Sequence, residues 1–214
     1  MTNQAHMFVD NSNLIGGAQK VARSIEGAPW PAVRIYWRNF FQLIEGDYLP
    51  VSRVLAGSLP PGNEELWQYA RRYGYNTSLL KRVRNDNGRL AEQAVDEVMH
   101  AKIAGALLDY EPPQTLVLVT GDGAHAEFGT SFLQQVQRAL KRGWCVDVIS
   151  WRLQLSGNFL RLAAQHKDQI RVVELESYYR SITFLSGGEY TDNLGNIVHV
   201  DERVVSPLPV SSTA

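Results

Sequence analysis

The sequence has little cysteine and no long hydrophobic run, and each scarcity excludes a class of protein. Cys145 is the single cysteine among 214 residues, so neither an intrachain disulfide nor a zinc site built from cysteines can form. No stretch of about 18 uninterrupted apolar residues is present, so we expect no membrane span. The first residues lack a basic segment followed by an apolar run, so we expect no secretory signal and a cytoplasmic location.

The chain also lacks an excess of charge of either sign. It carries 21 Lys and Arg residues against 22 Asp and Glu residues, for a net charge of -1. This balance argues against a simple polycation that would bind nucleic acid by charge alone. With 44% hydrophobic and 20% charged residues, the composition is that of a folded domain. The length suits one compact domain with a small appendage.

The charges are nevertheless sorted along the chain. Basic residues dominate residues 71–89 and return within residues 138–161, whereas acids dominate residues 92–127. Segregation of this kind suits an ordinary solvated surface. It equally suits an acidic pocket between basic rims, which would hold a polyanionic substrate over a metal ion.

Short apolar runs alternate with segments of helical periodicity, which predicts an α/β fold with three α/β/α layers and a mostly parallel central sheet. We expect strands at residues 6–10, 51–56, 77–83, 115–120, 145–149 and 170–174. We expect helices at residues 18–25, 35–44, 64–73, 90–109, 129–141 and 158–165. Gly16 and Gly17 are expected to form a turn ahead of the first helix.

The C-terminal part of the chain has a different pattern. Turn residues at 186–188 and 192–196 flank short apolar runs, which predicts an antiparallel β-hairpin. We therefore divide the chain into a main domain at residues 1–177, a hairpin extension at 178–205 and a flexible tail at 206–214.

Acidic residues stand near the carboxyl ends of two predicted strands. Asp10 ends the first strand, and Asp122 follows the buried run at residues 115–120 by two positions. Asp96 falls in the first turns of the long helix, and Glu127 precedes the next helix. Taken singly, each acid could simply cap a turn or favour a helix start. Together they are expected to meet in one crevice, because open parallel sheets bind ligands beyond the carboxyl ends of their strands.

Such a gathering of carboxylates favours a bound cation. Two carboxylates about 4 Å apart repel by roughly 4 kcal/mol at an effective dielectric constant of 20. A set of oxygen ligands prefers a hard ion such as Mg²⁺ or Mn²⁺, which engages phosphate oxygens and activates water. We therefore expect Asp10, Asp96 and Asp122 to bind the metal and Glu127 to orient water in metal-assisted phosphodiester hydrolysis.

Five further residues are candidates for contact with the substrate. Ser12 and Asn13 lie beside Asp10 and carry hydroxyl and amide groups that could orient it or a phosphate. Ser58 follows the second predicted strand, and Arg82 and Arg84 lie in the basic stretch. We expect these side chains to hold the polyanion.

Several segments carry a resemblance to a known family. Phe-Val-Asp-Asn-Ser-Asn-Leu at residues 8–14 resembles the opening motif of NYN domains, a group of the PIN-like ribonuclease superfamily. Further similar segments lie at residues 54–58, 94–98, 118–122 and 135–151. The resemblance implies a PIN-like three-layer fold, dependence on a divalent metal and cleavage of RNA.

The resemblance also assigns roles by position. It implies that Asp10, Asp96 and Asp122 match the acids of the family, with Glu127 a displaced equivalent of a further acid. Family members often have Lys and an acid where this chain has Gln93 and Lys102.

The expected function is thus a divalent-metal-dependent endoribonuclease, with RNA as its partner. The alternative is a catalytically inactive NYN-type module that binds RNA or a nucleotide. Two other classes fit less well: a metal-dependent adhesion domain would need Ser at Leu14, and a haloacid dehalogenase phosphatase would need Asp at Ser12. A C2 homodimer, the commonest assembly of soluble proteins, stays open beside a monomer.

Overall fold

A six-stranded parallel sheet forms the centre of the computed structural model, which describes residues 3–58, 64–80, 83–84, 90–91, 95–124, 130–192 and 195–209. The order of its strands is β4-β3-β1-β7-β8-β9, and every neighbouring pair is parallel. The strands are β1 (Gln4–Asp10), β3 (Leu49–Ser58), β4 (Asn76–Leu80), β7 (Thr115–Val119), β8 (Cys145–Ser150) and β9 (Ile170–Glu174). This sheet confirms the predicted α/β class.

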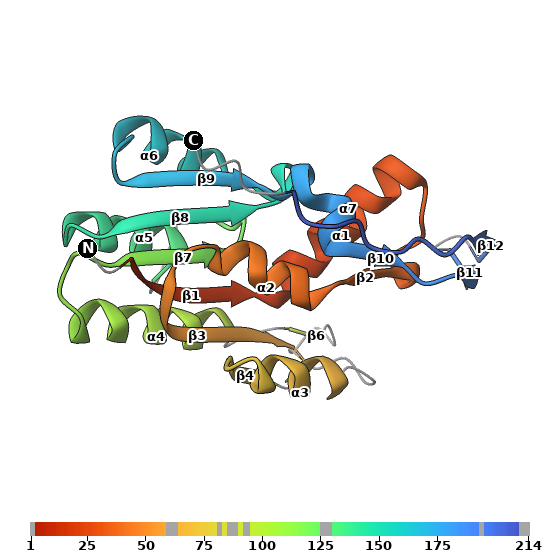
Figure 1. The fold of residues 1–214 in the computed structure, drawn as a ribbon, viewed down its shortest axis with the longest axis horizontal. Coiled ribbons are helices and arrows are strands. Elements are labelled where there is room, and N and C mark those ends of the chain that lie inside the picture. The colour runs from red at the N-terminus through yellow and green to blue at the C-terminus, as the bar shows by residue number, and fades with distance from the viewer. Residues whose placement is uncertain are drawn as a thin grey trace.

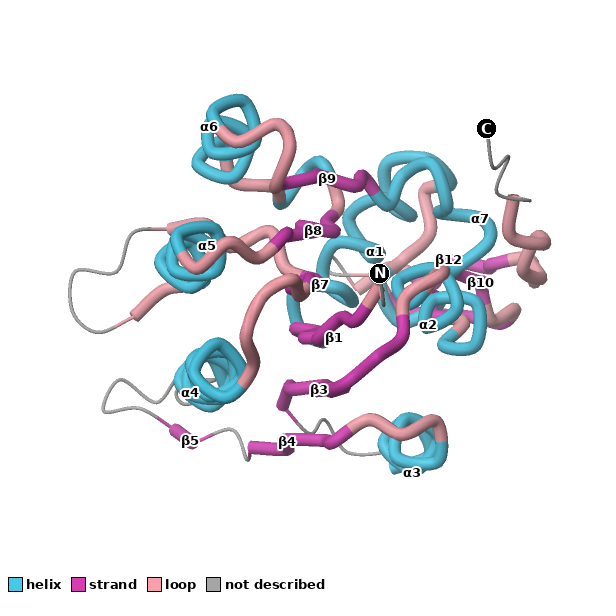
Figure 2. Tube along the Cα trace, turned by 60° about the vertical axis from the view of Figure 1, so that its left-hand side comes forward, coloured by secondary structure: helices cyan, strands magenta, loops and turns pink. Residues whose placement is uncertain are grey.

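Helices cover both faces of the sheet (Figure 2). One layer holds α1 (Asn11–Glu26), α2 (Trp37–Glu45) and α3 (Glu64–Arg72), and the other holds α4 (Val95–Asp109), α5 (Phe132–Lys141) and α6 (Gly157–Gln165). Strand residues alternate between the layers: Met7 and Val9 pack toward α1, whereas Phe8 packs toward α4 and α5. The three-layer arrangement is therefore confirmed. Among the described helices, none has the length and apolarity that crossing a bilayer requires.

The order of the strands reverses between β1 and β7. From β1 the chain builds β3 and β4 on one side, then crosses over to build β7, β8 and β9 on the other. Figure 1 shows the strand arrows pointing the same way, with α1 leaving from the carboxyl end of β1. In sheets of this type the crevice at such a reversal is the usual place for a ligand.

Shorter elements surround the sheet. They comprise the 3₁₀ turns η1 (Trp30–Ala32), η2 (Arg152–Gln154) and η3 (Leu175–Tyr178), helix α7 (Tyr179–Ile182), and strands β2 (Val33–Ile35), β5 (Val83–Arg84), β6 (Leu90–Ala91), β10 (Thr183–Leu185), β11 (Gly188–Thr191) and β12 (Ile197–Val200). Strands β11 and β12 form an antiparallel pair, as predicted for this part of the chain. Strand β10 pairs with β2, which ties the C-terminal segment to the main sheet domain.

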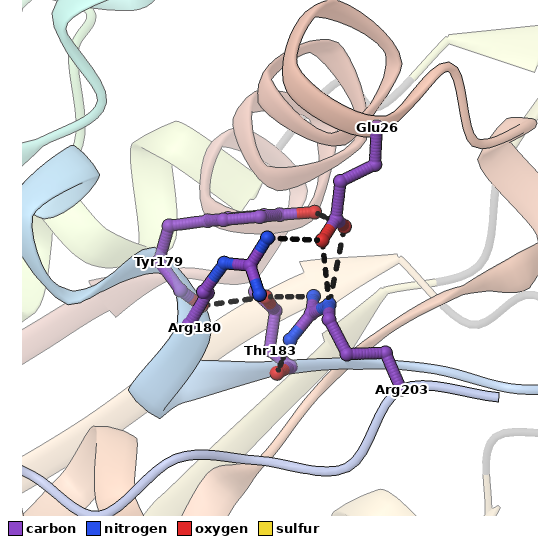
Figure 3. Close-up of polar contacts among 5 residues, drawn as sticks. All are labelled: Glu26, Tyr179, Arg180, Thr183 and Arg203. Atoms are coloured by element: carbon purple, nitrogen blue, oxygen red, sulfur yellow. Dashed lines mark hydrogen bonds and ion pairs between the residues drawn. The ribbon is translucent and has the colours of Figure 1, made fainter.

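A network of polar contacts fixes the C-terminal segment to the end of α1 (Figure 3). The Glu26 carboxylate lies 2.9 Å from Nε of Arg203 and accepts a hydrogen bond from the Tyr179 hydroxyl over 2.6 Å. Arg203 also donates to Thr183 through both terminal nitrogens. Burial and the nearby Glu26 carboxylate raise the pKa of Tyr179 to about 12, so its phenol stays a donor at neutral pH.

Two predicted helix starts are wrong by five residues or more. Helix α1 begins at Asn11 rather than at residue 18, and Gly16 and Gly17 lie inside it rather than in a turn. The reason is tertiary: a Cβ on Gly17 would meet Trp151 Cδ1 at 2.0 Å, so glycine lets residue 151 pack against the helix. The helix predicted from residue 90 begins at Val95, after the short strand β6.

Candidate functional site

Asp10 stands where β1 passes into α1. It is the N-cap of α1, and its Oδ1 accepts a hydrogen bond from the Asn13 backbone N–H over 3.0 Å. Its Oδ2 accepts from the hydroxyl of Thr120, which follows β7, over 3.2 Å. Asp10 is only 7% exposed. The carboxylate is thus anchored from two neighbouring strands at the point where strand order reverses.

The segment after β7 is linked to the same place. The backbone N–H of Asp122 donates to the Thr120 hydroxyl over 3.3 Å, and the Gly121 N–H donates to Oδ1 of Asn13 over 2.9 Å. Asp122 is exposed, and its Oδ1 accepts from the Ala124 N–H over 3.0 Å. The structure therefore brings together three of the predicted site residues: Asp10, Asn13 and Asp122.

The segment around Asp122 is packed too closely for side chains at its glycines. A Cβ on Gly121 would lie 2.3 Å from the backbone oxygen of Gln154, and one on Gly123 would lie 2.8 Å from Cβ of Ser156. The Ser156 N–H also donates to the Gly121 carbonyl over 3.0 Å. These contacts hold residues 121–123 close against η2 and the turn that follows it.

Helix α4 faces the crevice through His100. This residue is 6% exposed, its ring packs edge-on against Phe132, and its Nε2 has no hydrogen-bond partner among the described residues. Burial lowers the pKa of His100, while the negative charges of Glu97 and Asp122 oppose that shift. The negative charge of Asp122 therefore acts on His100 of α4. Asp96 is the second residue of α4 and is exposed.

The remaining predicted residues are placed only in part. Ser12 is half-buried in the first turn of α1. Ser58 ends β3 and Arg84 ends β5, and their side chains lie outside the described part of the chain. Glu127 and Arg82 lie wholly outside the described residues.

Two arginines of the second basic stretch are paired with carboxylates. Arg152 donates through Nε to Glu174 over 2.8 Å, and Arg142 pairs with Glu111 over 3.2 Å. Because Arg142 and Arg152 already have carboxylate partners, their charges are not free to form a basic rim beside an acidic pocket, which was one of the two interpretations of the charge pattern.

The oxygen donors at the crevice fit a hard cation of the Mg²⁺ type. Among the described residues, no group of three or more His, Cys, Asp or Glu side chains is placed to hold one ion. Mg²⁺ is commonly held by one or two carboxylates, with waters and substrate phosphates filling its shell. Asp10 and Asp122 are the two acidic residues that the Thr120 hydroxyl joins at the crevice.

A pocket of about 390 Å³ adjoins Asp122, and we call it the switch-point pocket. Its lining comes from α1, the segment after β7, η2 and the turn before α6: Asn13, Lys20, Gly121, Asp122, Gly123, Ala124, Leu153, Gln154 and Ser156. Sequence reasoning missed Lys20, Gln154 and the anchoring Thr120. The signal for Thr120 was present, since it directly ends the buried strand, but nothing local marks Lys20 or Gln154.

Comparison with known proteins places the fold without naming a family. No protein-family model matches the chain, and no curated protein matches it. The chain is similar to the crystal structure of a protein of unknown function from Vibrio parahaemolyticus, with a TM-score of 0.56 and 14% identity, over 81% of this chain and 94% of that one. The likeness shows the fold alone. Membership of the NYN group therefore stays a prediction.

Proposed function

We propose that this protein is a cytoplasmic, divalent-metal-dependent ribonuclease that hydrolyses RNA phosphodiester bonds beside the switch-point pocket. The observation that carries the proposal is the junction of Asp10 and Asp122 through the Thr120 hydroxyl, at the reversal of strand order. RNA as the substrate comes from the resemblance of the motifs around Asp10, Asp96 and Asp122 to NYN domains.

The start of α1 favours a cation over a directly bound phosphate. This strand order is also that of dinucleotide-binding folds, where a glycine-rich turn and a helix N-terminus receive the pyrophosphate. Here β1 passes into α1 with no intervening turn, and the Asp10 carboxylate already accepts from the Asn13 N–H. A phosphate brought to this spot would meet that negative charge, so a cation between them is needed.

Each residue of the crevice has a distinct part in the proposed reaction. Asp10 and Asp122 would hold Mg²⁺ or Mn²⁺, which when bound supplies charge stabilisation and an acidified water. Thr120 keeps the Asp10 carboxylate in one orientation through its hydrogen bond. Lys20, exposed at the pocket, would neutralise a substrate phosphate. We assign Glu127 to orienting water and Asp96 to the outer side of the metal site.

One observation favours a second candidate, a module that binds RNA without cleaving it. Asp10 and Asp122 make side-chain hydrogen bonds at the crevice, whereas Asp96 is exposed on α4. Gln93 and Lys102 also depart from the residues expected in active NYN domains. A site of this kind could keep its affinity for RNA with no turnover.

Cleavage of end-labelled single-stranded RNA separates the two candidates. The ribonuclease proposal expects cleavage with Mg²⁺ or Mn²⁺, none in excess chelator, and a loss of at least about 100-fold in Asp10→Asn and Asp122→Asn. Asp168→Asn, at an exposed acid on another surface, is the matched control and should keep the full rate. Cleavage that persists in chelator or in Asp10→Asn would contradict the proposal, and RNA binding without turnover would favour the second candidate.

A further inference from the structure

The switch-point pocket is larger than a metal site requires. Its volume of about 390 Å³ exceeds the space of one hydrated ion and lies near the lower end of pockets that hold small organic ligands, about 300 Å³. Asp122 forms part of its wall. A substrate whose phosphate reaches Asp122 would therefore place a neighbouring group of nucleotide size in this pocket.

Gln154 lines the pocket, and its side-chain amide is incompletely hydrogen-bonded. Its Oε1 is buried without a hydrogen-bond partner among the described residues, which is a costly state for a polar atom. The side chain lies across the two glycines of α1: Oε1 would be 2.4 Å from a Cβ on Gly17, and Nε2 would be 3.5 Å from one on Gly16. Because Oε1 is buried against α1, the side chain must turn before that oxygen can reach a ligand in the pocket.

The position of Gln154 is fixed relative to Asp122. Its backbone oxygen packs directly on Gly121, and its N–H donates to the Trp151 carbonyl over 3.0 Å within η2. Trp151 in turn donates through Nε1 to the Leu14 carbonyl of α1 over 2.8 Å. The backbone of Gln154 is therefore held beside the Asp122 segment by rigid elements rather than by a loose loop.

Two further side chains complete a nucleotide-shaped set. Leu153 is 64% exposed at the pocket, and its apolar surface could be covered by the face of a base. Lys20 contributes a positive charge from α1, which suits a phosphate. A nucleotide requires three features of a site: an apolar wall for the face of its base, a hydrogen-bonding group for the base edge and a cation for its phosphate.

We propose that the switch-point pocket binds one nucleotide of the RNA substrate and that the Gln154 amide hydrogen-bonds to the edge of its base. Leu153 covers the base and Lys20 contacts the phosphate. This inference rests on the proposed function for the identity of the ligand as RNA. The Gln154 amide is a binding group for the base in this arrangement, and Asp10 and Asp122 are the groups at the reaction centre.

The test uses the full chain and five small probes: the four nucleoside 5′-monophosphates and ribose 5-phosphate, which lacks a base. Binding in the presence of Mg²⁺ is followed by NMR at the backbone amides of residues 121–124 and 153–156. We expect Gln154→Leu to weaken the binding of each nucleotide by about five- to tenfold, which is the effect of losing one hydrogen bond. The affinity for ribose 5-phosphate should not change. Lys20→Ala should weaken the binding of all five probes by at least about threefold.

Matched controls separate these effects from general damage. Gln165→Leu and Lys141→Ala make the same changes at exposed positions on α6 and α5, and should bind every probe as the unaltered chain does. Circular dichroism verifies that Gln154→Leu folds. Because Lys20 is exposed, Lys20→Ala tests the pocket even if Gln154→Leu proves unstable.

The outcomes distinguish this inference from the ribonuclease proposal. Absence of nucleotide-induced shifts at the pocket amides, or equal nucleotide affinity in Gln154→Leu, would overturn the inference even if RNA is cleaved. Nucleotide binding that depends on Gln154 and is displaced by a short RNA, with no cleavage of that RNA, would support the inference while the ribonuclease proposal fails. Binding of free nucleotides that RNA does not displace would overturn the assignment of the pocket to RNA.

Discussion

The hydroxyl of Thr120 donates to Oδ2 of Asp10 over 3.2 Å and so joins the ends of two neighbouring parallel strands. Thr120 is 1% exposed, so this hydrogen bond is shielded from water. The same hydroxyl accepts the backbone N–H of Asp122. One buried hydroxyl thus contacts the carboxylate of Asp10 and the backbone of Asp122, the two residues that we assign to the metal.

Replacing Thr120 by valine removes the hydroxyl and keeps the shape of the side chain. Without this donor the Asp10 carboxylate loses the hydrogen bond to its Oδ2 and is less firmly oriented, so we expect metal-dependent RNA cleavage to fall by about 10- to 100-fold. Thr120→Ser, which restores a hydroxyl, should recover most of the rate. A Thr120→Val variant with full rate and full metal affinity would show that this hydrogen bond does not orient the site.

Substitution by alanine should have opposite effects on stability at Gly121, in the segment after β7, and at Gly105, within α4. A Cβ on Gly121 would meet backbone oxygen at 2.3 Å, so we expect Gly121→Ala to lower the free energy of unfolding by about 1–3 kcal/mol. Gly105 lies within α4 with open space around it, and Gly105→Ala should raise that free energy by about 0.5–1 kcal/mol. Urea unfolding measures both, and equal effects at the two sites would refute the packing argument.

The placement of the two carboxylates could be predicted from sequence because it depends on local patterns. The apolar run at β7 indicates a buried strand, and Asp10 ends a similar run at β1. Parallel strands direct their carboxyl ends to one edge, so residues that follow two neighbouring strands meet there. The sheet order itself, which makes β1 and β7 neighbours, was not predicted and comes from the structure.

The parts that could not be predicted depend on contacts between distant segments. Gly16 and Gly17 have the local chemistry of a turn, yet they lie within α1 because Trp151 and Gln154 pack against them. Lys20 has the pattern of an ordinary exposed helix residue, and only the approach of η2 to α1 makes it part of a pocket. Such positions become visible only once the packing of η2 on α1 is known.

Buried histidines should make stability depend on pH. Burial lowers the pKa of His6 and of His100 below the ordinary value of 6.5. The unfolded chain then binds protons more readily, so the free energy of unfolding is highest above pH 6.5 and falls as the pH drops from there through the lower folded pKa values. We expect His6→Gln and His100→Gln to flatten this dependence in urea unfolding, and His166→Gln, at an exposed site, to leave it unchanged. An unchanged slope in both buried variants would contradict this account.

The arginines that flank Glu26 should differ in their contribution to stability. Arg203 is 14% exposed in its side chain and lies 2.9 Å from Glu26, so Arg203→Met leaves a nearly buried carboxylate poorly compensated. We expect a loss of about 3 kcal/mol or more in the free energy of unfolding. Arg180 is 63% exposed and 3.4 Å from Glu26, so Arg180→Met should cost less than about 1 kcal/mol. Similar losses in the two variants would refute the distinction.

Paramagnetic Mn²⁺ tests most directly whether Asp10 and Asp122 share a hard cation. During titration of the isotope-labelled chain, bound Mn²⁺ broadens the NMR signals of nearby amides. We predict that the amides of residues 10–13 and 120–124 broaden first, that Mg²⁺ competes with this effect, and that the Asp10→Asn, Asp122→Asn double variant abolishes it while Asp168→Asn does not. Broadening centred elsewhere, or the same pattern in the double variant, would contradict the metal site.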